Sequence, residues 1–285
     1  MTAVVEQVTD AAPRRRRTHT TLVLGLCFAG AIALLALVSL FWLPFDPSDI
    51  SGGRLEGPSA EHLLGTDKLG RDLFTQLMIG ARIALVVGTA SVALAAVLGV
   101  AIGLLAAFSR PWVDDSLSAA LDVIIAFPVL LLAMLVVAVQ GASLWSAILA
   151  IGLAMSAVVA RLTRILARRV LHEQYITAAR TSGTRLPGIV AFHVLPNIAP
   201  TLGVNLALQF GAAVLAEASL SYLGLGAPPP NASWGRLLQE AQGTVLTAPV
   251  GAIAPGVALV VLVLGVNFIA DGLRDFADPT RRRTR

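Results

Sequence analysis

Long apolar runs separated by short polar segments make up almost the whole chain. Six such runs cover about residues 21–43, 83–108, 117–139, 143–159, 200–223 and 250–270. Each is close to or longer than the ~20 apolar residues with which a helix crosses a bilayer. Only 13% of the 285 residues are charged, about half of the ~25% typical of soluble domains. The pattern predicts an all-α integral membrane protein with about six transmembrane helices.

The first apolar run follows four arginines, as the apolar part of a secretory signal peptide follows its basic start. That part of a signal peptide has only about 7–15 residues, and the run at 21–43 is longer. We therefore interpret it as a transmembrane helix. The predicted division is a cytoplasmic tail at 1–20, a first transmembrane helix at 21–43, an external loop at 44–80, a five-helix core at 81–272 and a cytoplasmic tail at 273–285. Within the core, the polar segments are a loop at 161–200 and an external loop at 224–249.

Basic residues gather in alternate connecting segments. Sixteen of the 21 lysine and arginine residues lie in the two tails, at Arg110 and in the segment 161–200. Segments rich in arginine and lysine stay in the cytoplasm, so we expect both termini and the segment 161–200 there. The arginines flank apolar spans instead of covering one soluble face. They therefore indicate membrane topology, with lipid as the surrounding partner, and not nucleic-acid binding.

The segment 161–200 is the longest hydrophilic interruption of the apolar pattern. One face of a predicted helix within it carries Tyr175, Ala178, Ala179 and Ser182. Gly183 then interrupts the helix, and Thr184 is placed to cap a second short helix with Pro187 in its first turn. A basic helix–turn–helix between two spans is typical of a docking element for a cytoplasmic partner. A solvated basic loop that only fixes the topology has the same charge pattern.

The segment 65–72 has the two glycines of a P-loop, but not its chemistry. A P-loop needs a lysine and then a serine or threonine after the second glycine, whereas Arg71 and Asp72 stand there. No Gly-Lys-Ser/Thr occurs anywhere in the chain. The chain is therefore predicted to be no enzyme, with no catalytic residue and no cofactor of its own. A single cysteine, Cys27, and four scattered histidines predict neither a disulfide nor a metal site.

Local features mark individual spans and the second outer segment. Gly99 and Gly103 form the small-x3-small pattern of closely packed membrane helices. Pro128 breaks the third span and frees a backbone carbonyl at membrane depth. In the outer segment 224–249, a short helix at 234–242 has Asn231 or Ser233 as a candidate N-cap.

Three polar residues interrupt the fifth span. Asn205 and Gln209 are four residues apart on one helical face, and Glu217 follows. Polar groups inside a membrane mark functional pathways by default, so these three are candidate pathway-lining residues. Hydrogen bonds between neighbouring helices explain them equally well. They are too few and too scattered for a proton relay.

Five motifs run along the chain in order. They lie at 62–72 with 80–85, at 121–128, within 161–200, at 218–226 with 233–235, and at 271–275 with 278–279. Together they resemble the inner-membrane permease subunits of binding-protein-dependent ABC importers, in the dipeptide/oligopeptide/nickel family, and in particular its C-type subunit. The resemblance implies the type I ABC importer permease fold, with a cytoplasmic coupling helix pair in the segment 161–200.

The coupling loop of this family carries the motif E-A-A-x3-G-x9-I-x-L-P. Its matching positions here are Ala178, Ala179, Gly183, Leu195 and Pro196. Two positions depart from it, since Thr177 replaces the glutamate and His193 replaces the isoleucine. Glu173, four residues before Thr177, is a candidate for the missing acid. With Tyr175 on the same helical face, these residues form the predicted contact with the ATPase, except His193.

The resemblance also implies an assembly in the cell inner membrane. Its members would be this chain, a homologous permease subunit in a heterodimer, two ABC ATPase subunits in the cytoplasm and an extracytoplasmic solute-binding protein. ATP and Mg would be bound by the ATPase subunits. This chain would then form half of a translocation pathway for short peptides. Alternatives are import of nickel or another small solute, an ion-coupled secondary transporter, and a membrane scaffold that transports nothing.

Overall fold

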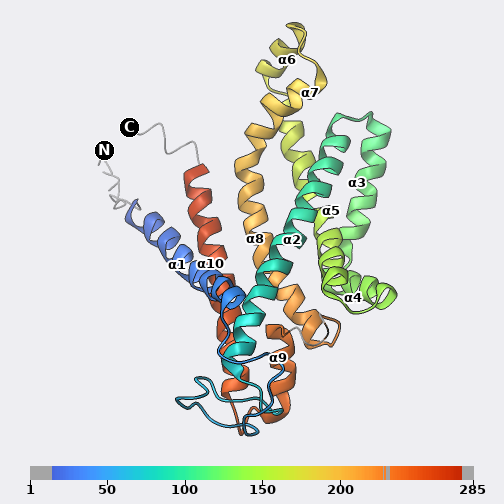
Figure 1. The fold of residues 1–285 in the computed structure, drawn as a ribbon. Helices are drawn as coiled ribbons and strands as arrows, with labels where there is room; N and C mark the ends of the chain where they lie inside the picture. The colour runs from blue at the N-terminus through green and yellow to red at the C-terminus, as the bar shows by residue number, and fades with distance from the viewer. Residues whose placement is uncertain (1–14, 227, 229–231, 278–285) are drawn as a thin grey trace, which may run out of the picture.

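The computed structural model describes residues 15–226, 228 and 232–277. Most of both predicted tails, the cap candidate Asn231 and the motif residues 278–279 lie outside them. Within the described residues the chain is helical and forms no strand. Figure 1 shows the helices α2, α5 and α8 running alongside one another, with α1 and α10 forming a second arm.

Seven helices form the body of the structure. They are α1 (Arg15–Phe41), α2 (Leu73–Phe108), α3 (Pro111–Ala126), α4 (Val129–Gln140), α5 (Leu144–Leu171), α8 (Leu195–Tyr222) and α10 (Val250–Ala277). Short elements connect them: α6 (Gln174–Thr181), α7 (Leu186–Ile189), the π-helical turn η1 (Val190–Val194), α9 (Trp234–Ala241) and the 3₁₀ turn η2 (Gln242–Thr244). In the described part of the chain, five helices are long and apolar enough to cross a membrane, or six when α3 and α4 count as one broken span.

The break in the third span lies at the predicted proline. Helices α3 and α4 meet at 89°, with Phe127 in an extended conformation between them. A residue before proline is pushed out of the α region by the proline ring, so Phe127 ends α3 and Pro128 begins the next helix. The prediction of a broken span at Pro128 is confirmed.

The external loop predicted for 44–80 is shorter than expected. Helix α2 begins at Leu73, not near residue 83, and runs unbroken for 36 residues. The carboxylate of Asp72 caps its start by accepting a hydrogen bond from the Thr75 amide at 2.7 Å. At 1.5 Å per residue, α2 is about 54 Å long, whereas the hydrocarbon core measures about 30 Å. The helix therefore continues beyond the bilayer.

The loop predicted for 161–200 is also shorter than expected. Helix α5 continues through the arginines to Leu171, and one continuous helical rod, Leu186–Tyr222, joins α7, η1 and α8. The rod passes through Pro200, which we expected to begin the fifth span. The connection outside the long helices therefore consists of α6 and its two turns, between His172 and Arg185.

Close packing of α2 on α5 depends on the predicted glycine pair. A Cβ atom on Gly99 would lie 2.5 Å from the Val159 Cβ, and one on Gly103 would lie 2.5 Å from the Ala160 carbonyl oxygen. Neither position has room for a side chain. The predicted role of the small-x3-small pattern in close packing is confirmed.

We expect Gly99→Ala to lower the free energy of unfolding by about 1–3 kcal/mol, because the added methyl group overpacks the α2–α5 contact. The matched control is Gly30→Ala on α1, where a Cβ meets nothing within 4 Å. That control should be neutral or slightly stabilising. Thermal unfolding of the two purified variants in detergent measures the difference, and equal melting temperatures would contradict the packing argument.

The two ends of the bundle differ. Helices α6 and α7 lie at one end, toward which α1 begins and α10 ends (Figure 1). Helix α9 and the segment before α2 lie together at the opposite end (Figure 1). The predicted coupling segment and the predicted outer segments are therefore on opposite sides of the bundle.

Candidate functional site

The short helix α6 is anchored to the bundle by one fully buried residue. Ile176 is fully buried in an apolar cluster with Ile189 of α7, Val194 of η1 and Ile198 of α8. Phe108, at the end of α2, packs against the same cluster. A movement of α6 would therefore act on the ends of α2, α5 and α8 that lie nearest to it. The sequence motif did not single out Ile176, which lies on the side of α6 opposite Ala178.

The opposite side of α6 is open. Ala178 is rotated about 200° from Ile176 around the helix and is exposed, as are Thr177 and Glu173. Tyr175 is 43% exposed, and Ala179 is half-buried. Of the predicted coupling residues on α6, Thr177 and Ala178 are thus exposed to solvent, whereas Ala179 lies closer to the buried side.

A left-handed glycine ends α6. Gly183 has φ +87°, and its amide donates to the Arg180 carbonyl at 3.0 Å, while the Thr184 amide donates to the Ala179 carbonyl at 3.0 Å. These two bonds form a Schellman motif. The expected cap at Thr184 is wrong. Arg185 is the N-cap residue of α7 and makes no side-chain cap bond, with Pro187 in the first turn as expected.

We expect Gly183→Val to lower strongly the solute uptake that the family resemblance implies. A β-branched residue at this φ costs about 1–2 kcal/mol and would reorient α6. A Cβ at Gly183 meets nothing within 4 Å, so strain is the only direct effect. Gly183→Asn is the matched control, since asparagine tolerates the left-handed region. Uptake by both variants, at equal amounts in the membrane, measures the effect. Equal activities would contradict this role for Gly183.

His193, which replaces the isoleucine of the motif, contacts a residue of α6. Its ring lies 6.2 Å from the Tyr175 ring, centroid to centroid, which joins η1 to α6. The His193 carbonyl accepts a hydrogen bond from the Asn197 side-chain amide at 2.6 Å. Leu195 and Pro196 begin α8 directly after the π-helical turn, where the Leu195 amide donates to the Val190 carbonyl. Proline has no amide hydrogen, and the wider turn accommodates it.

Arginines of α5 pair with acids of α3. Asp114 has a side chain only 2% exposed and accepts hydrogen bonds from Arg164 at 2.5 and 2.6 Å. Arg168 lies 2.5 Å from the same carboxylate, and Arg161 pairs with Asp122 at 3.1 Å. We expected these arginines only to set orientation. Their spacing of three and four residues already put them on one helical face, but the sequence did not reveal their partners.

The candidate pathway residues fall into two environments. Asn205 and Gln209 are half-buried on α8, and the Gln209 amide donates to the Asn205 carbonyl oxygen at 3.4 Å. Glu217 is only 2% exposed and accepts a hydrogen bond from Ser221 at 2.6 Å. Asn205 therefore borders open space, and Glu217 is packed inside this chain. A pathway-lining role for all three stays a prediction.

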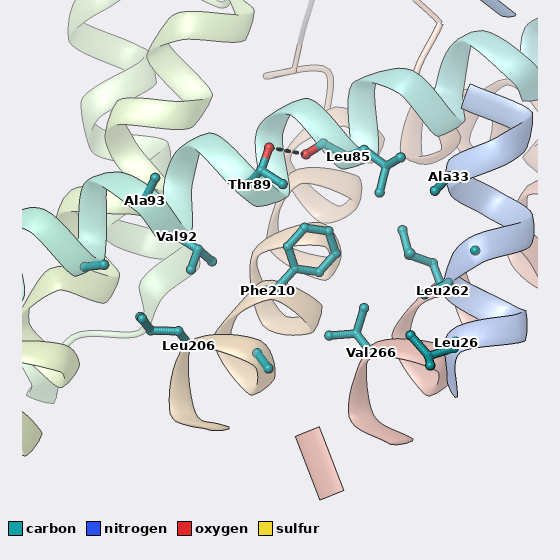
Figure 2. A pocket seen from close by; sticks show the side chains of 14 residues that line it. Leu26, Ala33, Leu85, Thr89, Val92, Ala93, Leu206, Phe210, Leu262 and Val266 are labelled. Atoms are coloured by element: carbon teal, nitrogen blue, oxygen red, sulfur yellow. Dashed lines mark hydrogen bonds between the residues drawn. The ribbon is translucent and has the colours of Figure 1, made fainter. Parts of the chain in front are cut away.

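An apolar groove separates the two arms of the bundle. It has a volume of about 610 Å³ between α1, α2, α8 and α10, and Figure 2 shows its hydrocarbon lining. The Thr89 hydroxyl, which borders it, donates to the Leu85 carbonyl of its own helix at 2.6 Å. The groove therefore offers hydrocarbon contacts and no free polar group to a ligand.

The two segments predicted to lie outside the membrane interlock into one cap. Arg71, which ended the false P-loop, bonds Asp67 at 2.6 Å and Glu240 of α9 at 2.7 Å. The Trp234 indole donates to the Leu77 carbonyl at 3.0 Å, and Ser233 caps α9 as expected. The motif at 62–72 therefore builds a structural joint between the two outer segments.

A family model described as "Binding-protein-dependent transport system inner membrane component" matches residues 99–283, which is more than half of the chain. The chain belongs to this family. The match covers the segment with α6 and the polar residues of α8. The resemblance inferred from the five motifs is thus confirmed, and the chain is a permease subunit of an ABC importer.

Curated relatives match almost the whole permease. A dipeptide transport system permease protein, DppC, of Alkalihalophilus pseudofirmus is 37% identical, with 96% of this chain and 92% of the relative covered. A glutathione transport system permease protein, GsiD, of Pectobacterium atrosepticum is 38% identical, over 88% and 85%. A di/tripeptide transport system permease protein, DppC, of Pseudomonas aeruginosa is 37% identical, over 90% and 86%.

A solved structure supports the type I permease fold. It is a chain of the MetNI methionine ABC transporter in an inward-facing conformation, and it superposes on this permease with a TM-score of 0.58. The match covers 71% of this permease and 96% of the solved chain, at 22% identity. The likeness concerns the fold alone.

Proposed function

We propose that this permease forms half of a translocation pathway that imports short peptides. The observation that carries the proposal is the exposed surface of α6, anchored by Ile176 to the inner ends of three long helices. A rigid attachment on one side and an open small-residue surface on the other suit an element that passes a partner's movement to the bundle. The names of the curated relatives support peptides as the substrate class.

The energy would come from partner subunits. No nucleotide-binding motif occurs in this chain, so two ATPase subunits in the cytoplasm would bind ATP and Mg and dock on α6. Glu173, Tyr175, Thr177, Ala178 and Ala179 would line this contact. Gly183, Leu195 and Pro196 would shape the turn and the start of α8 that hold α6 in place.

The second half of the pathway would come from a homologous permease in a heterodimer. Positive charge on the α6 side supports a cytoplasmic location for both termini. On the other side, the cap formed by α9 and the segment before α2 would receive a solute-binding protein. ATP-driven closure of the ATPases would then rock the bundle between outward-facing and inward-facing states.

Uptake by the complete importer in proteoliposomes tests the substrate class. We expect ATP-dependent accumulation of a labelled di- or tripeptide when the solute-binding protein is present, and none without ATP. A transporter of another small solute would accumulate labelled nickel or that solute, and it would not accumulate the labelled peptide. An ion-coupled transporter would work without ATP when an ion gradient is imposed. Either result would overturn the proposal.

A further inference from the structure

A second cavity, of about 530 Å³, opens between α5, α8 and α10 in the half of the bundle nearer α6. Its lining residues are Leu162, Thr201, Val204, Asn205, Leu208, Arg274 and Asp275. From Thr201 to Leu208 the wall formed by α8 is about 10 Å long. The cavity therefore extends from the inner end of α10 into the membrane-spanning part of the bundle.

The cavity is rich in hydrogen-bond donors. The Asn205 carbonyl oxygen accepts the bond from Gln209, and the Asn205 NH₂ group makes no hydrogen bond within the described residues. Within the described residues, the Thr201 hydroxyl makes no hydrogen bond and Arg274 makes no ion pair. These three groups, an amide, a hydroxyl and a guanidinium, can all donate to one acceptor. The apolar groove of Figure 2 offers nothing comparable.

An anionic acceptor such as a carboxylate fits these donors. Arginine binds carboxylates through parallel N–H bonds, and charge-assisted bonds of this kind are the strong ones. Every linear peptide carries one carboxylate at its C-terminus whatever its sequence. We propose that the cavity between α5, α8 and α10 receives the C-terminal carboxylate of a peptide on its way to the cytoplasm, with Arg274 as the principal donor. This inference rests on the proposed import of peptides.

The neighbouring acid suits release. Asp275 borders the same cavity and places a carboxylate beside Arg274. A transport site must bind firmly enough to admit its substrate and weakly enough to let it leave. The coupling role does not involve the motif at 271–275. Binding and release of the carboxylate would be the function of this motif.

Protection of a cysteine in the cavity tests the inference directly. Leu208→Cys, in a Cys27→Ser background, places a single thiol in the wall of the cavity. We would label it with an anionic thiol reagent in inside-out vesicles that contain the complete importer. Trialanine at millimolar concentration should slow labelling at least about threefold, and trialanine amide should not. Equal protection by both peptides, or protection by neither, would overturn the inference.

Arg274 variants then identify the donor. Arg274→Gln should abolish protection by trialanine, and Arg274→Lys should retain it, because lysine keeps the charge. Arg110→Gln, at an exposed arginine that begins α3, is the control and should leave protection unchanged. Protection that survives Arg274→Gln would overturn the assignment. Peptide uptake without protection would overturn only this inference, whereas absence of peptide uptake would overturn the proposed function as well.

Discussion

Ala178→Trp is expected to insert and fold normally and to lose at least about tenfold of ATP-driven uptake. Ala178 faces away from the bundle and is exposed, so an indole there disturbs nothing within this chain. In the assembled importer it would separate α6 from the surface of the ATPase, and each 1.4 kcal/mol of lost docking energy reduces binding about tenfold. Uptake per molecule of membrane-inserted permease is the measurement.

Ala119→Trp is the matched control for this substitution. Ala119 is an exposed alanine on α3, outside the coupling surface, and its replacement should leave uptake within about twofold of wild type. Co-purification of the ATPase separates two causes of inactivity. Ala178→Trp should retain less ATPase than wild type and than Ala119→Trp. Normal uptake by Ala178→Trp would contradict the coupling role of this face.

Asp114→Ala is expected to destabilise the permease by about 3 kcal/mol. Removing one partner of a buried ion pair leaves the other charge without compensation, which typically costs about 3–5 kcal/mol. Asp114 is buried and neutralises Arg164 and Arg168 together. Its loss should loosen α3 from α5 beside the coupling helix. Thermal unfolding in detergent measures the effect.

Two comparisons make this expectation specific to burial. Asp122→Asn breaks the pair with Arg161, in which both side chains are more than half exposed, and should cost less than about 1 kcal/mol. The double variant Asp114→Ala/Arg164→Leu should recover part of the loss, because apolar replacement of a buried pair is often neutral. A larger loss for Asp122→Asn than for Asp114→Ala would contradict this account of the arginines.

Residues that act through their own backbone or size could be interpreted from the sequence. Pro128 ends α3 because its ring restricts the backbone of Phe127, and a glycine in the left-handed region, such as Gly183, ends a helix. Gly99 and Gly103 likewise imply close packing whichever helix covers them. These expectations agree with the structure because each depends on one residue and its immediate neighbours.

Helix ends and side-chain partners depend on residues far away in the chain. The arginines of α5 suggested a loop, yet the helix continues through them, and Asp114, 50 residues before Arg164, pairs with two of them. The start of α2 depends on a cap that belongs to the interlocked outer segments. The Tyr175–His193 contact likewise joins two elements across a turn. Hydrophobic periodicity predicts which face of a helix is apolar. It does not predict which polar side chains bind one another.

The central claim is that α6 carries the contact with the ATPase. A photoactivatable crosslinker on a single cysteine at Ala178→Cys, in the Cys27→Ser background, tests this most directly in the assembled importer. We predict a covalent adduct of the permease with the ATPase subunit, whose yield changes when ATP is added, and no such adduct from Ala119→Cys. Absence of the adduct from Ala178→Cys, in an importer that still hydrolyses ATP and takes up solute, would contradict the account.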